Sequence, residues 1–214
     1  MQSAAHSGLK PPSRSSREGC LPAFSLVELL VVISMIGLLA AVALPAVSSN
    51  LSAVNLGGAA QRLADELAQA RQLAIVRNRA VELRIYKDGQ SGAGEGFRRT
   101  ALVTPGAAPS WISSGRELPS GVVIDGRETF SSIIGGLAAS ENPSGPAPPA
   151  LRGLEHRVIR FLPSGRVEVD GLANTPLTLS LRMENAPGGG EVPAANFIAI
   201  VLDPITGRAA LFQP

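Results

Sequence analysis

The chain has 214 residues, of which 45% are hydrophobic and 17% charged, and this length allows one ordinary domain with a sizeable core plus a terminal segment. Its 19 basic and 17 acidic side chains give a net charge of +2, but three bases and one acid precede Phe24 and the remaining charges balance, which argues against a general nucleic-acid-binding surface. Cys20 is the only cysteine and lies in the same N-terminal segment, which excludes an intramolecular disulfide and a cysteine-based metal site.

The first predicted element is an apolar segment from Phe24 to Leu44, which is 21 residues long and carries one charge. A helix needs about 20 apolar residues to cross a bilayer. The bases before the segment predict that residues 1–23 stay in the cytoplasm and that the C-terminal bulk is exported. Three interpretations are open: a cleaved secretory signal with Ala41-Val42-Ala43 as its cleavage site, a plain membrane anchor, and a pilin-type precursor.

The single charge of this segment, Glu28, distinguishes among the three interpretations. A carboxylate near the start of an apolar helix costs roughly 2–3 kcal/mol to insert, and neither a disposable signal nor a plain anchor gains anything from it. Cleavage between Ala23 and Phe24 would create an α-amino group four residues from Glu28. That ammonium could pair with Glu28 of a neighbouring subunit, so that the buried charge sets the register of assembly.

The run FSLVELLVVI from Phe24 resembles the class III signal of type IV pilins and type II secretion pseudopilins, with Phe at the first mature position and Glu28 at the fifth. Gly37 and Pro45 stand where the family often has these residues. The residue before the cut is Ala23, whereas the family usually has Gly there. The resemblance implies cleavage after Ala23 by prepilin peptidase, N-methylation of Phe24, and a kink or local melting of the helix at Pro45.

After Pro45 the spacing predicts that the helix resumes, with an apolar stripe on one face and polar residues on the other. The stripe consists of Leu51, Val54, Leu63, Leu67, Ala70 and Ala74. The polar face consists of Arg62, Asp65, Glu66, Gln69, Arg71 and Gln72. Gly57 and Gly58 weaken this helix, because each Gly costs about 1 kcal/mol relative to Ala.

The passage from Leu63 to Ile85, LADELAQARQLAIVRNRAVELRI, resembles the helix-to-first-strand region of H-type minor pseudopilins and FimT-like pilins. The matching positions are Leu63, Leu67, Ala70, Arg71, Ala74, Arg77 and Val81. The long helix, the loop insertions and the Tyr of R-I-Y-K are also similar to the narrower family labelled Verru_Chthon cassette protein D. An ordinary helix running into a strand explains the periodicity but not the placement of Arg71 and Arg77.

Alternating residues predict a series of strands with turns between them. The predicted strands are 80–86, 101–104, 121–124, 158–162, 166–169, 177–183, 197–202 and 209–212. Two of the turns end in a shared Gly-Arg pair, Gly165-Arg166 and Gly207-Arg208, in which Gly supplies a positive φ and Arg begins the return strand. The Gly-rich segment 88–96 and the Pro-rich segment 138–149 predict loops, the second an exposed, mobile insertion.

No catalytic constellation is predicted, and we expect neither a cofactor nor a metal site. His156 is the only histidine after Phe24 and is expected at the surface or at a strand edge. Asp125 and Glu128 could pair as acid and base, but they flank a predicted turn. Ser residues lack a G-x-S-x-G motif. Scattered arginines such as Arg98, Arg99 and Arg208 are too few for a phosphate-binding surface, so nucleic acid is not an expected partner.

We therefore predict an α+β fold in which a long N-terminal helix, transmembrane and then amphipathic, packs on an antiparallel β-sheet. The expected parts are a cytoplasmic leader (1–23), a transmembrane helix (24–47), an amphipathic helix (48–78) and an exported β-rich domain (79–214). The predicted function is that of a minor pilin or pseudopilin, a non-enzymatic subunit of a pilus or secretion pseudopilus.

The expected partners are other pilin or pseudopilin subunits, prepilin peptidase and an inner-membrane assembly platform. The expected location is the bacterial inner membrane, single-pass with a periplasmic C-terminal domain, and then the filament. Two alternatives remain open: a secreted or anchored β-rich binding protein that uses residues 1–43 as an ordinary signal, and a DNA-uptake pilin.

Overall fold

The structure of the chain is a computed structural model. The chain divides into two compact units, residues 1–45 and 46–214. For residues 42–50 the structure describes the backbone alone. The described ranges are 25–87, 96–113, 115–140, 142, 146–172, 176–186 and 192–213.

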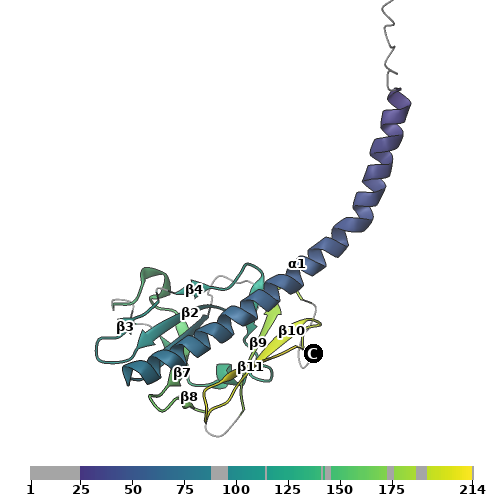
Figure 1. The fold of residues 1–214 in the computed structure, drawn as a ribbon. Helices are drawn as coiled ribbons and strands as arrows, with labels where there is room; N and C mark the ends of the chain where they lie inside the picture. The colour runs from purple at the N-terminus through teal and green to yellow at the C-terminus, as the bar shows by residue number, and fades with distance from the viewer. Residues whose placement is uncertain are drawn as a thin grey trace, which may run out of the picture. The chain divides into compact units, whose positions relative to one another are not determined.

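The N-terminal element is one α-helix, α1, from Leu26 to Arg77 (Figure 1). Its first turn is capped by Ser25, whose hydroxyl accepts a hydrogen bond from the backbone N–H of Val27 at 3.3 Å. The backbone is helical at Pro45 and on both sides of it, so local melting, one of the two expectations for Pro45, is not seen. Among the described residues, no helix is both long and apolar enough to cross a membrane.

The second half of α1 lies across one face of the sheet (Figure 1). Its buried side chains recur at helical spacing and are Leu56, Ala59, Ala60, Leu63, Leu67, Ala70 and Ala74. Two residues of the predicted stripe, Leu51 and Val54, are instead 59% and 71% exposed. They lie before the first turn that contacts the sheet, so periodicity alone placed them wrongly. Glu66, predicted on the polar face, is buried at 7% exposure.

The strands described by the structure form one antiparallel sheet, whose order is β11-β10-β9-β5-β2-β1-β7-β6. The longer strands are β1 (Val81–Lys87), β2 (Gly96–Thr104), β5 (Val122–Asp125), β7 (Glu155–Phe161), β9 (Leu177–Met183), β10 (Phe197–Leu202) and β11 (Ala209–Phe212). The short ones are β3 (Ser110–Trp111), β4 (Arg116–Glu117), β6 (Ala139–Ser140) and β8 (Val167–Glu168), and two 3₁₀ turns are η1 (Ser132–Gly135) and η2 (Pro149–Leu151).

The core lies between α1 and the sheet. Odd-numbered residues of β1, such as Val81 and Leu83, join this core together with Phe161, Leu179 and Ile200 of other strands. Alternate residues of a strand point to opposite faces, so Glu82, Arg84 and Tyr86 lie on the outer face. The prediction of an α+β fold with a helix on an antiparallel sheet is confirmed. A transmembrane character of the helix remains a prediction.

The outer face of the sheet carries a second apolar cluster, formed by Tyr86, Ala101 and Leu151 with Trp111 and Leu154 against it. Leu151 follows the Pro-rich segment that was predicted to be an exposed, mobile insertion. The described residues of that segment are mostly exposed, as predicted, including Ala139–Ser140, which pairs with β7. The prediction of exposure was wrong for Ala147, which is 2% exposed. The apolar residues that end the segment draw it onto the sheet.

The prediction that His156 lies at the surface or at a strand edge was also wrong. His156 is 3% exposed, because β7 is flanked there by β1 on one side and by β6 on the other. Its ring lies 5.0 Å from that of Tyr86. The predicted strand edge is occupied by β6, a two-residue strand that alternation could not reveal.

Candidate functional site

The residues predicted for processing and assembly lie at the start of the chain. Ala23 and Phe24 fall outside the described residues. Glu28 lies in the first turn of α1, and Gly37 lies farther along the same helix, where an added Cβ would have no heavy atom within 4 Å. Pro45 is within α1, at the boundary of the two compact units, and only its backbone is described. The structure thus places Glu28, Gly37 and Pro45 along α1, and the roles of all five residues stay predictions.

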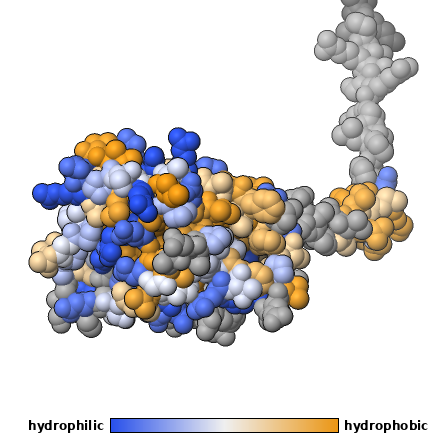
Figure 2. Space-filling view, turned by 90° about the horizontal axis from the view of Figure 1, so that it is seen from below, coloured by the Kyte–Doolittle hydropathy of each residue, from blue (hydrophilic) through white to orange (hydrophobic). Residues whose placement is uncertain are grey.

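The first part of α1 exposes apolar side chains, and Figure 2 shows the described part of this segment as predominantly hydrophobic. The exposed apolar residues are Leu26, Val27, Leu29, Leu30, Val31, Val32, Ile33, Met35, Ile36, Leu38 and Leu39. Glu28 is the only charged residue between Ser25 and Ala41. A surface of this kind is unfavourable in water and indicates a segment that is covered by lipid or protein.

A second notable arrangement joins residues far apart in sequence, and we call it the hairpin junction: Arg71, Gly165, Thr206 and Gly207. Arg71 Nε donates a hydrogen bond to the backbone carbonyl of Thr206 at 2.6 Å. An added Cβ on Gly165 would lie 3.4 Å from the guanidinium of Arg71. The two turns predicted to share a Gly-Arg exit therefore meet at the arginine that was singled out in the helix.

Both glycines of the junction have left-handed backbone conformations, with φ of 83° at Gly165 and 63° at Gly207. Such conformations favour glycine. The junction is extended by a hydrogen bond of 2.8 Å from the backbone N–H of Val167 to the carbonyl of Pro204. The turn before β8 and the turn before β11 are thus fastened to each other and to α1.

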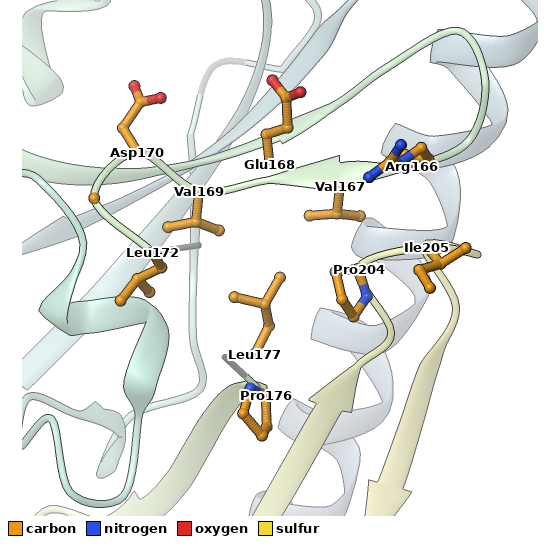
Figure 3. Close-up of a pocket in the computed structure, with 11 residues that line it drawn as sticks. Arg166, Val167, Glu168, Val169, Asp170, Leu172, Pro176, Leu177, Pro204 and Ile205 are labelled. Carbon is orange, nitrogen blue, oxygen red and sulfur yellow. The ribbon is translucent and has the colours of Figure 1, made fainter. Parts of the chain in front are cut away.

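An open groove of about 860 Å³ lies next to this junction, between β8 and the starts of β9 and of the β10–β11 turn (Figure 3). Val167, Val169 and Leu177 line it, while the carboxylates of Glu168 and Asp170 point away from it in Figure 3. Among the described residues of the lining there is no histidine, cysteine or amide side chain. The groove exposes side chains of the core, such as Val167 and Leu177.

Of the two carboxylates considered as an acid–base pair, Glu128 is exposed and Asp125 is buried beside two arginines. Asp125 ends β5, is 3% exposed, and accepts hydrogen bonds from Arg127 at 2.5 Å. Arg182 lies 3.3 Å from the same carboxylate. Burial by itself raises the pKa of Asp125, but the hydrogen bonds and charge of Arg127, with the charge of Arg182, outweigh it and hold this pKa below its ordinary value of 3.8. Asp125 is therefore ionised and structural.

The lowered pKa of Asp125 predicts acid-sensitive stability. A carboxyl whose pKa is lowered by folding stabilises the protein fully above its unfolded-state pKa, and this contribution is lost as the pH falls through the folded-state pKa. We expect Asp125→Asn to be clearly less stable than the wild type at neutral pH and the difference to shrink below about pH 4. Denaturant unfolding of both proteins between neutral pH and pH 2 measures this difference; a pH-independent gap would contradict the proposed charge pairing.

Among the residues that the structure describes, no group of three or more His, Cys, Asp or Glu side chains could hold a metal ion. Within the described part of the chain, Glu66 is one of two buried carboxylates, with Glu82, that the sequence analysis did not single out. It accepts a hydrogen bond from the Thr100 hydroxyl at 2.5 Å and lies 3.4 Å from Arg116. This contact fastens α1 to β2, and no local signal in the sequence could have indicated it.

A family model matches more than half of the chain. The family model described as "Type II transport protein GspH" matches residues 59–194, which include the end of α1 and the strands from β1 to β9. The chain belongs to the GspH family. The matched region contains the Leu63–Ile85 passage, so the predicted H-type pilin-like or pseudopilin character is confirmed. The narrower resemblance to Verru_Chthon cassette protein D stays a prediction.

Two further proteins are similar to this GspH-family chain. Pilin-like protein PilA1 of Thermus thermophilus is 41% identical over 68 residues, which are 32% of this chain and 42% of that protein. The chain therefore matches less than half the length of this relative. The minor pseudopilin EpsH from the Type 2 Secretion System of Vibrio cholerae has a TM-score of 0.40 and 17% identity, with 75% of this chain and 96% of EpsH covered.

Proposed function

We propose that this GspH-family protein is a minor structural subunit of a type II secretion pseudopilus or a type IV pilus, and that it assembles through the first part of α1. The observation that carries the proposal is the exposed apolar surface from Leu26 to Leu39, interrupted by one carboxylate, Glu28. Such a surface needs a lipid or protein environment. The β-rich domain from residue 79 to residue 214, which we call the head, follows α1 and contains most of the region that matches the GspH family.

Before assembly, the segment from Phe24 to Leu44 anchors the subunit in the bacterial inner membrane, because its 21 residues have the length that a spanning helix requires. The preceding bases keep residues 1–23 in the cytoplasm and the head on the periplasmic side. Prepilin peptidase then cuts between Ala23 and Phe24, and Phe24 is N-methylated. An inner-membrane assembly platform and the other subunits are the partners of the next step.

In the filament, Glu28 of one subunit pairs with the new N-terminal ammonium of a neighbour. An unpaired carboxylate in an apolar environment costs free energy. The helix register that pairs Glu28 with the ammonium is therefore more stable than registers that leave it unpaired. Gly37 lets a neighbouring helix approach closely, because it has no side chain. The space beside it is open, with no heavy atom within 4 Å of the position that a Cβ would occupy. Pro45 lacks a backbone donor and is the point where α1 can bend during assembly.

Substitution of Glu28 tests this proposal. Glu28→Ala removes an insertion cost of roughly 2–3 kcal/mol, so the variant is expected to enter the membrane at the wild-type level or above. It is expected to be absent from the filament fraction sheared from cells, because the partner of the N-terminal ammonium is missing. Immunoblots of the membrane and filament fractions, compared with wild type, measure both effects.

Glu117→Ala is a matched control, because this carboxylate is 56% exposed and lies 3.5 Å from Arg99 at the surface of the head. Loss of that pair changes stability little, so the control is expected in both fractions. Normal incorporation of Glu28→Ala would refute the register role. The mass of the mature wild-type chain separates the alternatives: a start at methylated Phe24 supports pilin-type processing, and a start near Leu44 supports an ordinary secretory signal.

We propose a structural rather than an enzymatic role. The family is structural, and the buried carboxylates Asp125 and Glu82 are each occupied in ion pairs with arginines of the fold. The same arginines are occupied in ion pairs, which limits their use for phosphate. A DNA-uptake role is therefore less well supported than the structural one.

A further inference from the structure

The C-terminal strand β11 lies at one end of the sheet order and pairs on one side with β10. No other described strand pairs with its second side. Its sequence, Ala209-Ala210-Leu211-Phe212, has no charge and no proline. Edge strands of natural proteins usually carry such features to prevent pairing with other chains. Their absence makes β11 an open edge.

The register identifies which backbone groups face outward. The backbone N–H of Asp203 donates to the carbonyl of Arg208 at 2.9 Å, which makes these residues a hydrogen-bonded pair. Hydrogen-bonded and non-hydrogen-bonded pairs alternate along an antiparallel ladder. Ala210 and Phe212 therefore bond to β10, whereas the N–H and C=O groups of Ala209 and Leu211 point away from the sheet.

The side chains of the same two residues lie on the face that α1 covers. Leu211 is opposite Ile200, and Ala209 is opposite Leu202, and both of these partners belong to the core. Leu211 is nevertheless 43% exposed. The core is thus open at this edge of the sheet, where one more strand would cover it.

A groove of about 510 Å³ lies beside the start of β11, between this strand and α1. Its lining includes small residues of the helix, Ala64 and Ala68, and two arginines, Arg71 and Arg208. No acidic side chain is among the lining residues that the structure describes. The groove is therefore positively charged, and its small helical side chains leave room for an extended chain.

We propose that the β11 edge and this groove bind an extended segment of another protein, which adds to the sheet as a further strand. The segment pairs with the outward backbone groups of Ala209 and Leu211, places an apolar side chain against Leu211, and places a carboxylate next to Arg208. Main-chain pairing gives affinity in this mode of binding, and side-chain pockets give specificity. This docking does not depend on the assembly through α1 proposed above.

Charge complementarity favours a different protein over a second copy. Two β11 strands paired with each other would bring no carboxylate to Arg208, because β11 is uncharged. A nucleic acid is also disfavoured, since neutralising a phosphate backbone requires several exposed bases. Arg71 is already held by its hydrogen bond to Thr206, which leaves Arg208 as the exposed base of the groove.

The test uses the full chain in detergent micelles and a fluorescein-labelled peptide of about ten residues, with valine at alternate positions and a central glutamate. Fluorescence anisotropy is expected to show saturable binding that Arg208→Glu weakens about fivefold to tenfold. A second peptide with lysine in place of glutamate is expected to reverse this order, binding Arg208→Glu more tightly than wild type. Hydrogen exchange of the Ala209 and Leu211 amides is expected to slow when the first peptide binds.

Arg166→Glu is the matched control, because Arg166 is exposed and also follows a turn glycine, Gly165, but lies outside the β11 groove. It is expected to bind the glutamate peptide like wild type. Equal weakening by Arg166→Glu and Arg208→Glu, or binding without slower exchange in β11, would overturn the proposal. So would tighter binding of a short double-stranded DNA than of the peptide, or self-association that Arg208→Glu leaves unchanged while no peptide binds.

Discussion

Gly207→Ala is expected to lower the free energy of unfolding by about 3 kcal/mol or more, since it combines backbone strain with a steric clash. The φ of Gly207 is 63°, and an added Cβ would lie 2.3 Å from the carbonyl oxygen of Gly165. The obstructing atom is backbone, so the clash is relieved only by moving one hairpin turn. Denaturant unfolding of the full chain in detergent measures the loss.

Gly153→Ala separates strain from clash. Gly153 also has a positive φ, 74°, but an added Cβ would have no neighbour within 4 Å. It is expected to cost about 1 kcal/mol, the strain of a left-handed conformation alone. Equal losses at Gly153 and Gly207 would mean that the hairpin junction is not tightly packed, and the role assigned to the contact between its turns would be wrong.

The hairpin junction illustrates how far the sequence could predict the fold. Both turns were predicted from their glycines, and Arg71 from the family resemblance, because turn chemistry and motif spacing are local signals. Their meeting point was not predicted. It depends on a hydrogen bond between residues 135 positions apart, Arg71 and Thr206, and on the strand order of the whole sheet.

Strand prediction shows the same contrast between local sequence signals and tertiary pairing. The runs 177–183, 197–202 and 209–212 coincide with β9, β10 and β11, because their alternation reports burial on one face. The two-residue strands β3 and β4 were missed, since each exists only by pairing with β2. The start of β2 at Gly96 was predicted as loop; β2 pairs closely with β5 there, where a Cβ on Gly96 would lie 3.2 Å from Val123.

The two candidate sites differ in the same way: local sequence indicates one of them and not the other. Glu28 could be found in the sequence because one carboxylate in an apolar segment has a cost that calls for a function. The β11 edge could not, because the four residues Ala209–Phe212 read as an ordinary strand. Their significance arises from their position at the end of the sheet order and from the groove beside α1, both of which are set by tertiary packing.

Glu82→Ala is expected to lower the free energy of unfolding by about 3–5 kcal/mol, because it breaks a buried ion-pair network from the centre. The Glu82 side chain is 4% exposed on the outer face of β1. Its carboxylate lies 2.8 Å from the guanidinium of Arg84 and 3.1 Å from that of Arg160. Without Glu82, Arg84 loses this ion pair and keeps its charge at 12% side-chain exposure, with its guanidinium 5.7 Å from the centre of the Trp111 ring.

Glu155→Ala provides the comparison for the loss of a carboxylate. Glu155 forms an ion pair of 2.7 Å with Arg157, but the Glu155 side chain is 40% exposed. Arg157 keeps its hydrogen bond of 2.7 Å to the carbonyl of Ile134 when Glu155 is removed, so the expected cost is below about 1 kcal/mol. A double variant, Glu82→Ala with Arg84→Ala, is expected to be more stable than Glu82→Ala alone, because it also removes the largely buried guanidinium that has lost its ion pair with Glu82. If the double variant were less stable than Glu82→Ala, packing rather than charge would explain the loss.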